Sequence, residues 1–301
     1  MLTNDAFRKL LVALFVGLAF AAGHAAAAQD EDTSKAIKAE VFIKDRPAKP
    51  ATRRTTVRYR PAVKIATDPN ADVPPRGMSF AQVGVTFWRF RRSTAADKTK
   101  ELVEDEDGSV EWTLERIEEG TPLAPGQRVR LSIESLTRTG YLYVIDREQY
   151  ADGTLGEPML IFPTQKTRDM NNVKPGRLVY LPSASGKFRI KPSDGPKQHV
   201  GELITVIVSS EPLIDPEQLG PRSIKLPRQQ VEAWEKQWGV ATTRFEMTDG
   251  AGTIMTEKEQ AAGANTAAEM TQDDPTPQTV YRLAIKPENP ILFSVPMKFR
   301  R

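Results

Sequence analysis

Short apolar runs, each bounded by turn residues, constrain the fold of this chain more than any other feature. Residues 141–145 are apolar throughout and residues 203–208 nearly so, a pattern typical of strands covered on both faces. In residues 128–134 apolar side chains alternate with polar ones, as in a strand with one solvated face. Strands this short pack as two facing sheets. The sequence therefore predicts an all-β fold, an antiparallel β-sandwich of immunoglobulin-like or jelly-roll-like type.

Turn residues place the domain boundary and the hairpins. Strand-like alternation begins at residue 80, so we expect the β-sandwich domain to span residues 80–301. Asp107-Gly108 and Asp152-Gly153 predict hairpin turns, because glycine accepts a positive φ without steric cost. A closing hairpin is expected between residues 280–285 and 291–299. Three further apolar runs predict shorter strands, at residues 159–162, 178–181 and 187–190.

Two late segments depart from the strand pattern. Apolar residues recur at helical spacing in residues 227–239, which begin with Pro227 and end with Gly239. Proline at the start and glycine just past the end are typical helix boundaries, so we predict one late helix here. Residues 248–278 carry a net charge of −5 and are rich in alanine, glycine, threonine and glutamine. We interpret them as a flexible, disordered acidic insertion in the domain.

The first 28 residues have the three zones of a secretory signal peptide. Arg8 and Lys9 precede an apolar run at residues 10–20, and small residues lead to Ala28 before Gln29. The apolar run is shorter than the ~20 residues of a membrane-spanning helix, although an uncleaved anchor stays an alternative. We therefore expect residues 1–28 to be removed and the mature protein to be exported, to a bacterial periplasm or the extracellular space, with no transmembrane segment.

Residues 29–79 contain few large apolar side chains and are interpreted as a basic extended arm, with short β-like stretches at residues 41–43 and 56–59. Residues 41–66 alone carry a net charge of +7. Three hypotheses follow from this charge. The arm is a solvated tail, or it attaches the protein to an anionic envelope polymer, or it lies against the acidic residues 248–278 of its own chain.

A set of basic and aromatic residues forms the candidate contact site for an anionic partner. Arginine interleaved with aromatic rings binds polyanions through counterion release and stacking, and Trp88 and Phe90 stand beside the last three members of the set. After export the available polyanions are lipopolysaccharide, phospholipid surfaces and extracellular DNA, and a nucleic-acid partner is not the one we expect. The candidate contacts are Arg53, Arg54, Arg58, Tyr59, Arg60, Arg89, Arg91 and Arg92.

Several kinds of chemistry are excluded by residue types that are missing. The chain has no cysteine, and loss of the signal peptide removes His24 and leaves His199 as the only histidine. Thiol catalysis, thiolate metal sites and sites with several histidines are therefore excluded. Asp146, Glu148 and Asp152 do not match the spacing of a calcium loop, so a solvated turn is favoured there. We expect no catalytic residues, no metal and no cofactor.

The middle of the chain resembles the bacterial family of domain of unknown function number 4384. The residues that carry the resemblance lie within residues 84–213 and include Pro125-Gly126-Gln127-Arg128, Gly140-Tyr141-Leu142-Tyr143, Leu160-Ile161-Phe162-Pro163, Leu181-Pro182 and Ser209-Ser210-Glu211-Pro212. The resemblance implies a secreted or envelope-associated bacterial protein with a β-sandwich module. It implies no activity and no catalytic set.

These observations favour an exported, non-catalytic interaction module of the cell envelope or extracellular space, which binds a protein or an anionic envelope partner. One alternative is a carboxylate-dependent glycan hydrolase, because such enzymes need no more than two suitably spaced carboxyl groups. Another alternative is an accessory subunit of a surface assembly or secretion system. The sequence does not identify the partner or the oligomeric state.

Overall fold

The computed structural model describes residues 39–49, 63–65, 73–105, 108–183, 186–264 and 268–300. The predicted signal peptide, residues 1–28, lies outside this part of the chain. The chain divides into two compact units at Ser34, and all described residues belong to the second unit. No helix in the described part is both long and apolar enough to cross a membrane.

The first sheet is built around one long strand, β2 (Ser79–Arg92), which pairs antiparallel with three others. The first half of β2 pairs with β14 (Thr279–Ile285) and the second half with β4 (Gly108–Ile117), while β5 (Arg128–Ser135) pairs with its middle. The remaining strands are β1 (Val63–Ile65), β3 (Glu101–Asp105), β9 (Leu178–Leu181), β10 (Phe188–Arg189) and β13 (Thr242–Met247).

The second sheet has the strand order β12-β7-β6-β11-β15, and β8 pairs with the start of β6. Its strands are β6 (Gly140–Tyr150), β7 (Met159–Phe162), β8 (Asn172–Val173), β11 (His199–Ser209), β12 (Ile224–Lys225) and β15 (Ile291–Lys298). The two apolar runs of the sequence form β6 and β11, neighbours in the middle of this sheet. Side chains cover both faces of these strands, which is why their runs lack polar alternation.

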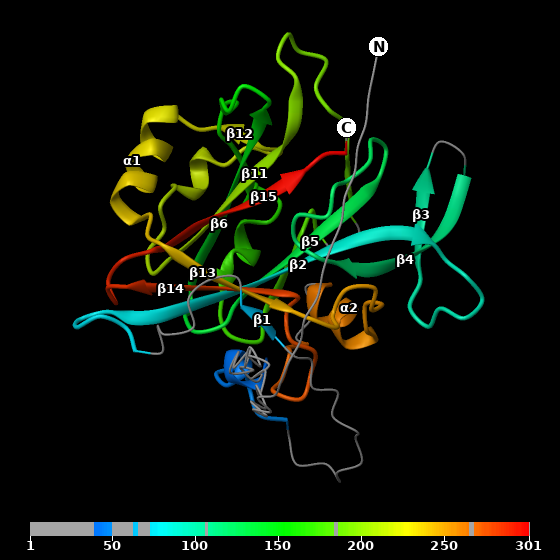
Figure 1. Cartoon of the computed structure of the whole chain (residues 1–301), viewed down its shortest axis with the longest axis horizontal. Helices are drawn as coiled ribbons and strands as arrows, with labels where there is room; N and C mark the ends of the chain where they lie inside the picture. Colours follow the sequence, from blue (N-terminus) through cyan, green and yellow to red (C-terminus); the bar gives the residue numbers. More distant parts are fainter. Residues whose placement is uncertain are drawn as a thin grey trace, which may run out of the picture. The chain divides into compact units, whose positions relative to one another are not determined.

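The main core lies between the two sheets (Figure 1). Val83, Val85 and Phe87 of β2 face it from the first sheet, and Leu142 and Val144 of β6 face it from the second. All five are buried, and burial of each such side chain contributes about 1.5–3 kcal/mol. The prediction of an all-β sandwich with a late helix is confirmed, as are the hairpins β3-β4 and β6-β7.

The outer face of the second sheet is covered by helix α1 (Arg228–Trp238), which begins directly after Pro227 and ends at Gly239 as the sequence predicts. Val231 of this helix is buried in a second cluster with Tyr143 and Ile145 of β6. Short 3-10 helices, η2 (Arg168–Met170) and η3 (Pro216–Gln218), lie in the connecting loops.

The predicted closing hairpin is wrong, because its two strands belong to different sheets. β14 pairs with β2 and β13 in the first sheet, whereas β15 pairs with β11 in the second. Tyr281 of β14 stacks on Phe293 of β15 across the core, with ring centroids 4.3 Å apart. The turn between the strands therefore carries the chain from one sheet to the other, and both apolar runs pair with edges that would otherwise stay open.

The acidic residues 248–278 are not a flexible insertion over their described part. They include a second short helix, α2 (Glu257–Gly263), with Thr256 as its N-cap in a capping box with Glu259. The segment covers the outer face of the first sheet, where Met255 packs in a cluster with Trp88 and Tyr180. The sequence prediction fails here because it rests on the many acidic residues of the segment, whereas a few apolar contacts hold the segment in place.

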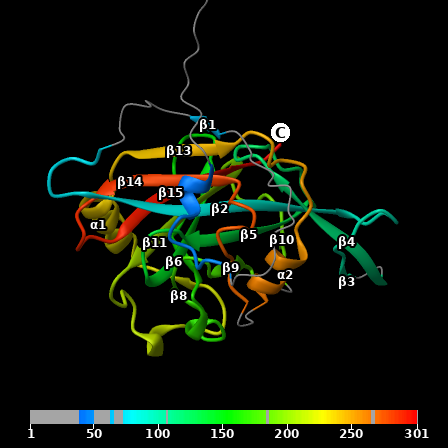
Figure 2. The same ribbon diagram turned by 90° about the horizontal axis from the view of Figure 1, so that it is seen from below.

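The described part of the predicted arm is also folded. Residues 41–43 belong to a 3-10 helix, η1 (Ala39–Ile43), and not to a β-like stretch. Phe42 and Ile43 are buried against Phe245 of β13 and Val280 of β14, and Figure 2 shows η1 in blue beside these strands. Burial of these two large apolar side chains helps to hold this piece of a basic segment on the sheet.

Candidate functional sites

The predicted anion-binding residues fall into two groups. Arg53, Arg54, Arg58, Tyr59 and Arg60 lie outside the described residues. Arg89, Arg91 and Arg92 lie on β2, and the first two are bound by carboxylates of their own chain. Arg89 pairs with Glu115, while Arg91 pairs with Asp97 at 2.6 Å and with Glu115 at 3.2 Å. The hydrogen bond from Arg91 lowers the pKa of Asp97 well below its ordinary value. These ion pairs engage both arginines within their own chain, while their side chains stay 39% and 31% exposed.

Of the aromatic side chains in that prediction, Tyr59 lies outside the described residues, whereas Trp88 and Phe90 do not face solvent. Trp88 and Phe90 are 1% and 4% exposed, because they point into the cluster beneath the acidic segment. The Trp88 ring nitrogen donates to Ser132 at 3.0 Å, and Arg116 lies over the ring. Neither ring is available to an external ligand.

A different group of basic residues gathers at the end of the first sheet. Arg92 and Arg128 both lie over the Trp112 ring, with guanidinium carbons 4.7 and 4.5 Å from its centroid. Arg189 is the cross-strand partner of Arg128, and Lys191 follows two residues later, on the same side of an extended chain. Arg92, Arg189 and Lys191 are exposed. We call Arg92, Arg128, Arg189 and Lys191 the basic surface.

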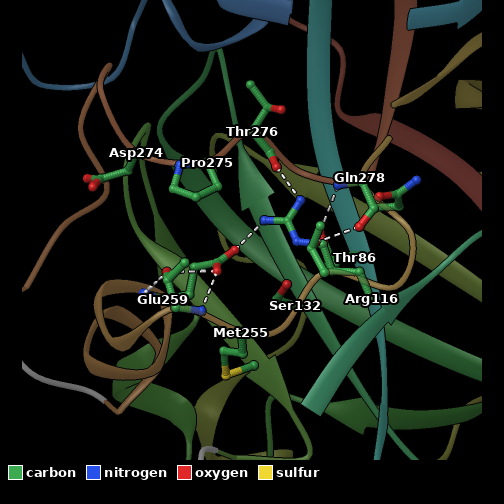
Figure 3. A network of polar contacts seen from close by, with 12 residues as sticks. Thr86, Arg116, Ser132, Met255, Glu259, Asp274, Pro275, Thr276 and Gln278 are labelled. Carbon is green, nitrogen blue, oxygen red and sulfur yellow. Dashed lines mark hydrogen bonds and ion pairs between the residues drawn. The ribbon is translucent and has the colours of Figure 1, made fainter. Parts of the chain in front are cut away.

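A polar network beneath the acidic segment links this segment to the first sheet (Figure 3). Arg116 of β4 pairs with Glu259 of α2 and donates to the Thr276 carbonyl at 2.7 Å. The Gln278 backbone N–H donates to Thr86 at 2.9 Å. The cavity beside this network has a volume of about 10 Å³, which is room for about one water molecule. The network therefore anchors the segment and offers no space for a ligand.

A larger cavity opens where the core-facing rows of β6 and β11 end. Its volume is about 90 Å³. Asp146 continues the row of Leu142 and Val144, and Glu202 continues the row of Ile204. Both carboxyl groups line the cavity, whose other walls are mostly apolar and include Leu131, Ile161, Leu181, Phe188, Met297 and Phe299.

The two carboxyl groups are in hydrogen-bonding contact with each other. Asp146 Oδ1 and Glu202 Oε2 are buried, and no donor among the described residues reaches either oxygen. Two ionised carboxylates in contact would repel each other, so the pair favours a state in which one of them keeps a proton. Burial is the largest cause that raises the pKa of Asp146 to about 6 and that of Glu202 to about 9. At neutral pH the pair as a whole therefore holds one proton.

His199 contacts Glu202 and helps to fix the position of its carboxyl group. Its side chain is 1% exposed, and the Ser193 backbone N–H donates to Nδ1 at 2.9 Å. The ring proton therefore lies on Nε2, which is 2.8 Å from the Gly201 carbonyl and 3.2 Å from Glu202 Oε1. Glu148, the cross-strand partner of Glu202, accepts a hydrogen bond from the Tyr150 hydroxyl. Buried in this way, His199 cannot reach a substrate.

The shared proton predicts a specific pH dependence of stability. Folded Glu202 keeps its proton up to a pKa of about 9, whereas its ordinary value is 4.5, so unfolding releases this proton between those pH values. Stability therefore falls as pH rises through this window. We expect Glu202→Gln, which cannot ionise, to increase the free energy of unfolding at pH 8 by about 1–3 kcal/mol and to have little effect at pH 4. Urea denaturation at both pH values measures this.

The control for this prediction is Glu211→Gln, which changes an exposed carboxylate near the end of the same strand. It should leave the pH profile of the natural protein unchanged. An equal loss of stability between pH 4 and pH 8 in the natural protein and in Glu202→Gln would contradict the shared proton.

Sequence reasoning missed the carboxyl pair because its members are 56 positions apart in the chain, on paired strands. At the level of the sequence, Asp146 and Glu148 are grouped with Asp152 as the residues of a candidate calcium loop. In the structure, Asp152 lies on the hairpin turn and accepts hydrogen bonds from Thr154. In the described part of the chain no group of three or more His, Asp or Glu side chains could hold a metal ion. The available signal was that Asp146 stands in a core-facing position of a buried strand.

Comparisons of the chain with protein-family models, with curated proteins and with solved structures found no match. The resemblance to domain of unknown function number 4384 stays a prediction.

Proposed function

We propose that this protein is an exported, non-catalytic binding module that attaches to the phosphate groups of an anionic envelope glycolipid of the lipopolysaccharide type. The observation that carries the proposal is the basic surface. Three exposed cations and Arg128 are held at one end of a rigid sheet, and two of the guanidinium groups lie over Trp112. Guanidinium groups fixed in this way match the oxygens of phosphate with little loss of side-chain freedom.

Two neighbouring acidic residues, Glu101 and Glu111, pair with cations that are not part of the basic surface. Glu101 accepts two hydrogen bonds from Arg130, at 2.7 and 2.9 Å, and Arg130 is 1% exposed. Glu111 pairs with Lys100 at 3.0 Å. An anion that approaches the basic surface therefore meets a positive potential.

The alternative glycan hydrolase finds less support in the carboxyl geometry. Glycosidases need two carboxyl groups about 5–9.5 Å apart, with a sugar or a water between them. Asp146 and Glu202 are in direct contact and share a proton in a cavity of about 90 Å³. Two carboxyl groups in contact leave no space between them for a sugar or a water molecule. The pair is suited to binding and not to glycosidic bond cleavage.

Binding to immobilised lipopolysaccharide tests the proposal. We expect the triple variant Arg92→Ala/Arg189→Ala/Lys191→Ala to bind about 10- to 100-fold more weakly than the natural protein, because each cation near an anionic surface contributes about 1 kcal/mol. The affinity of the natural protein should fall as salt is added, and that of the triple variant should fall less steeply.

The matched control removes three exposed lysines that lie elsewhere, in the variant Lys44→Ala/Lys98→Ala/Lys166→Ala. It changes the net charge by the same amount and should keep most of the affinity. Equal weakening in the two triple variants would show that net charge, and not the basic surface, governs binding, and this result would overturn the proposal.

A further inference from the structure

The cavity between β6, β11 and β10 has the features of a second binding site. It combines mainly apolar walls with a small number of polar groups in one place, as small-ligand sites usually do. A volume of about 90 Å³ is several times the roughly 10–15 Å³ that one water molecule needs on the same measure, and it leaves room for a short aliphatic chain. The basic surface does not explain why two acidic side chains stand in the core-facing rows of β6 and β11.

The two carboxyl groups of this cavity lack a hydrogen-bond donor for one oxygen each. Asp146 Oδ1 and Glu202 Oε2 are buried, and in the described part of the chain the shared proton is the only hydrogen available to them. The other Glu202 oxygen is already held by His199 Nε2 at 3.2 Å. A buried carboxyl group without a donor destabilises the fold, so a ligand that brings hydrogen-bond donors recovers this cost.

We propose that this cavity binds the primary ammonium group of a short aliphatic amine, with the ammonium against Asp146 and Glu202 and the aliphatic chain against the apolar walls. An ammonium group supplies three donors and a positive charge. It can therefore satisfy both oxygens, and its charge favours release of the proton that they share.

Other charged groups near the cavity do not change its preference for an ammonium group. Glu148 adds a further carboxylate next to Glu202. Arg189 and Lys191 also line the cavity, but both are exposed, so solvent screens their charges more than those of the buried pair. The nearest charges that a buried ligand atom meets are therefore acidic.

Titration calorimetry with n-butylamine, n-butyrate and n-butanol on the mature chain tests the proposal. We expect butylamine to bind with an affinity on the order of millimolar, butanol more weakly and butyrate not at all. In two buffers of different ionisation enthalpy, the observed heats with butylamine should differ at pH 7, because the pair loses its proton on binding.

Two double variants decide between this site and non-specific binding. Asp146→Asn/Glu202→Gln keeps the size of both side chains and should weaken butylamine binding at least about tenfold. The control, Asp152→Asn/Glu157→Gln, removes two exposed carboxylates and should bind like the natural protein. Undetectable butylamine binding, equal binding by the two double variants, or tighter binding of butyrate would each overturn the proposal. None of these results depends on lipopolysaccharide binding, so the two proposals fail separately.

Discussion

Arg46→Met should lower the free energy of unfolding by about 3–5 kcal/mol, a large part of the 5–15 kcal/mol that is typical of a folded domain. Arg46 follows η1, and its side chain reaches Glu134 of β5 through Nη2 at 2.6 Å and Nε at 2.8 Å. The two side chains are 1% and 0% exposed. Without Arg46, Glu134 keeps a buried charge, and the donor left to it among the described residues is the Gly176 backbone N–H at 3.0 Å. Urea denaturation measures the loss.

A second variant separates the buried charge from general damage to the segment. Arg46→Met/Glu134→Gln removes the charge and keeps an acceptor for Gly176, so it should recover at least about 1 kcal/mol of the loss. The control in the same segment is Lys44→Ala, an exposed position that should change stability by less than about 0.5 kcal/mol. If Lys44→Ala costs as much as Arg46→Met, the ion pair is not what holds residues 39–49.

Glu259→Ala should destabilise the protein by about 3–5 kcal/mol, because one carboxylate serves two purposes. One oxygen pairs with buried Arg116, and the other accepts from the Thr256 backbone N–H at 2.9 Å and hydroxyl at 2.8 Å. Alanine leaves the Arg116 charge buried and removes the capping box of α2. Hydrogen exchange should show faster exchange in residues 250–263, and denaturation gives the global change.

Two further variants rank the two contributions of Glu259. Glu259→Gln keeps an acceptor for the cap but loses the charge, so its stability should fall between those of the natural protein and of Glu259→Ala. Glu257→Ala, an exposed acid in the first turn of the same helix, should cost less than about 1 kcal/mol. A loss in Glu257→Ala equal to that in Glu259→Ala would contradict the role of the Arg116 pair.

The predictions that succeeded rest on local signals. β6, β11 and α1 are continuous segments whose periodicity and boundary residues fix the element type before any partner is known. The predictions that failed concern partners. Residues 280–285 and 291–299 read equally well as a hairpin or as strands of two sheets, and tertiary packing across the core placed them in separate sheets.

Charge was the least reliable guide to order and to function. The composition of the acidic residues 248–278 and of the basic residues 39–49 indicates solvated segments, yet a few buried contacts hold both. The two segments also contact each other, since Gln272 donates to the Lys44 carbonyl at 2.8 Å. Composition counts every charge equally, whereas one paired and buried arginine can anchor a segment that is otherwise polar. For the same reason Arg89 and Arg91 are occupied, while Arg92 joins Arg128 and Arg189 in a surface that no sequence window contains.

The sequence by itself determined that this chain forms β-strands, where several of them lie, and which chemistry its residue types exclude. Tertiary structure alone decided which polar side chains meet. Asp146 and Glu202 are brought together by the register of β6 and β11, and Arg46 and Glu134 by the docking of η1 on the first sheet. Periodicity follows from local backbone geometry, but the pairing of distant charges depends on burial, which exists only after the sheets have packed.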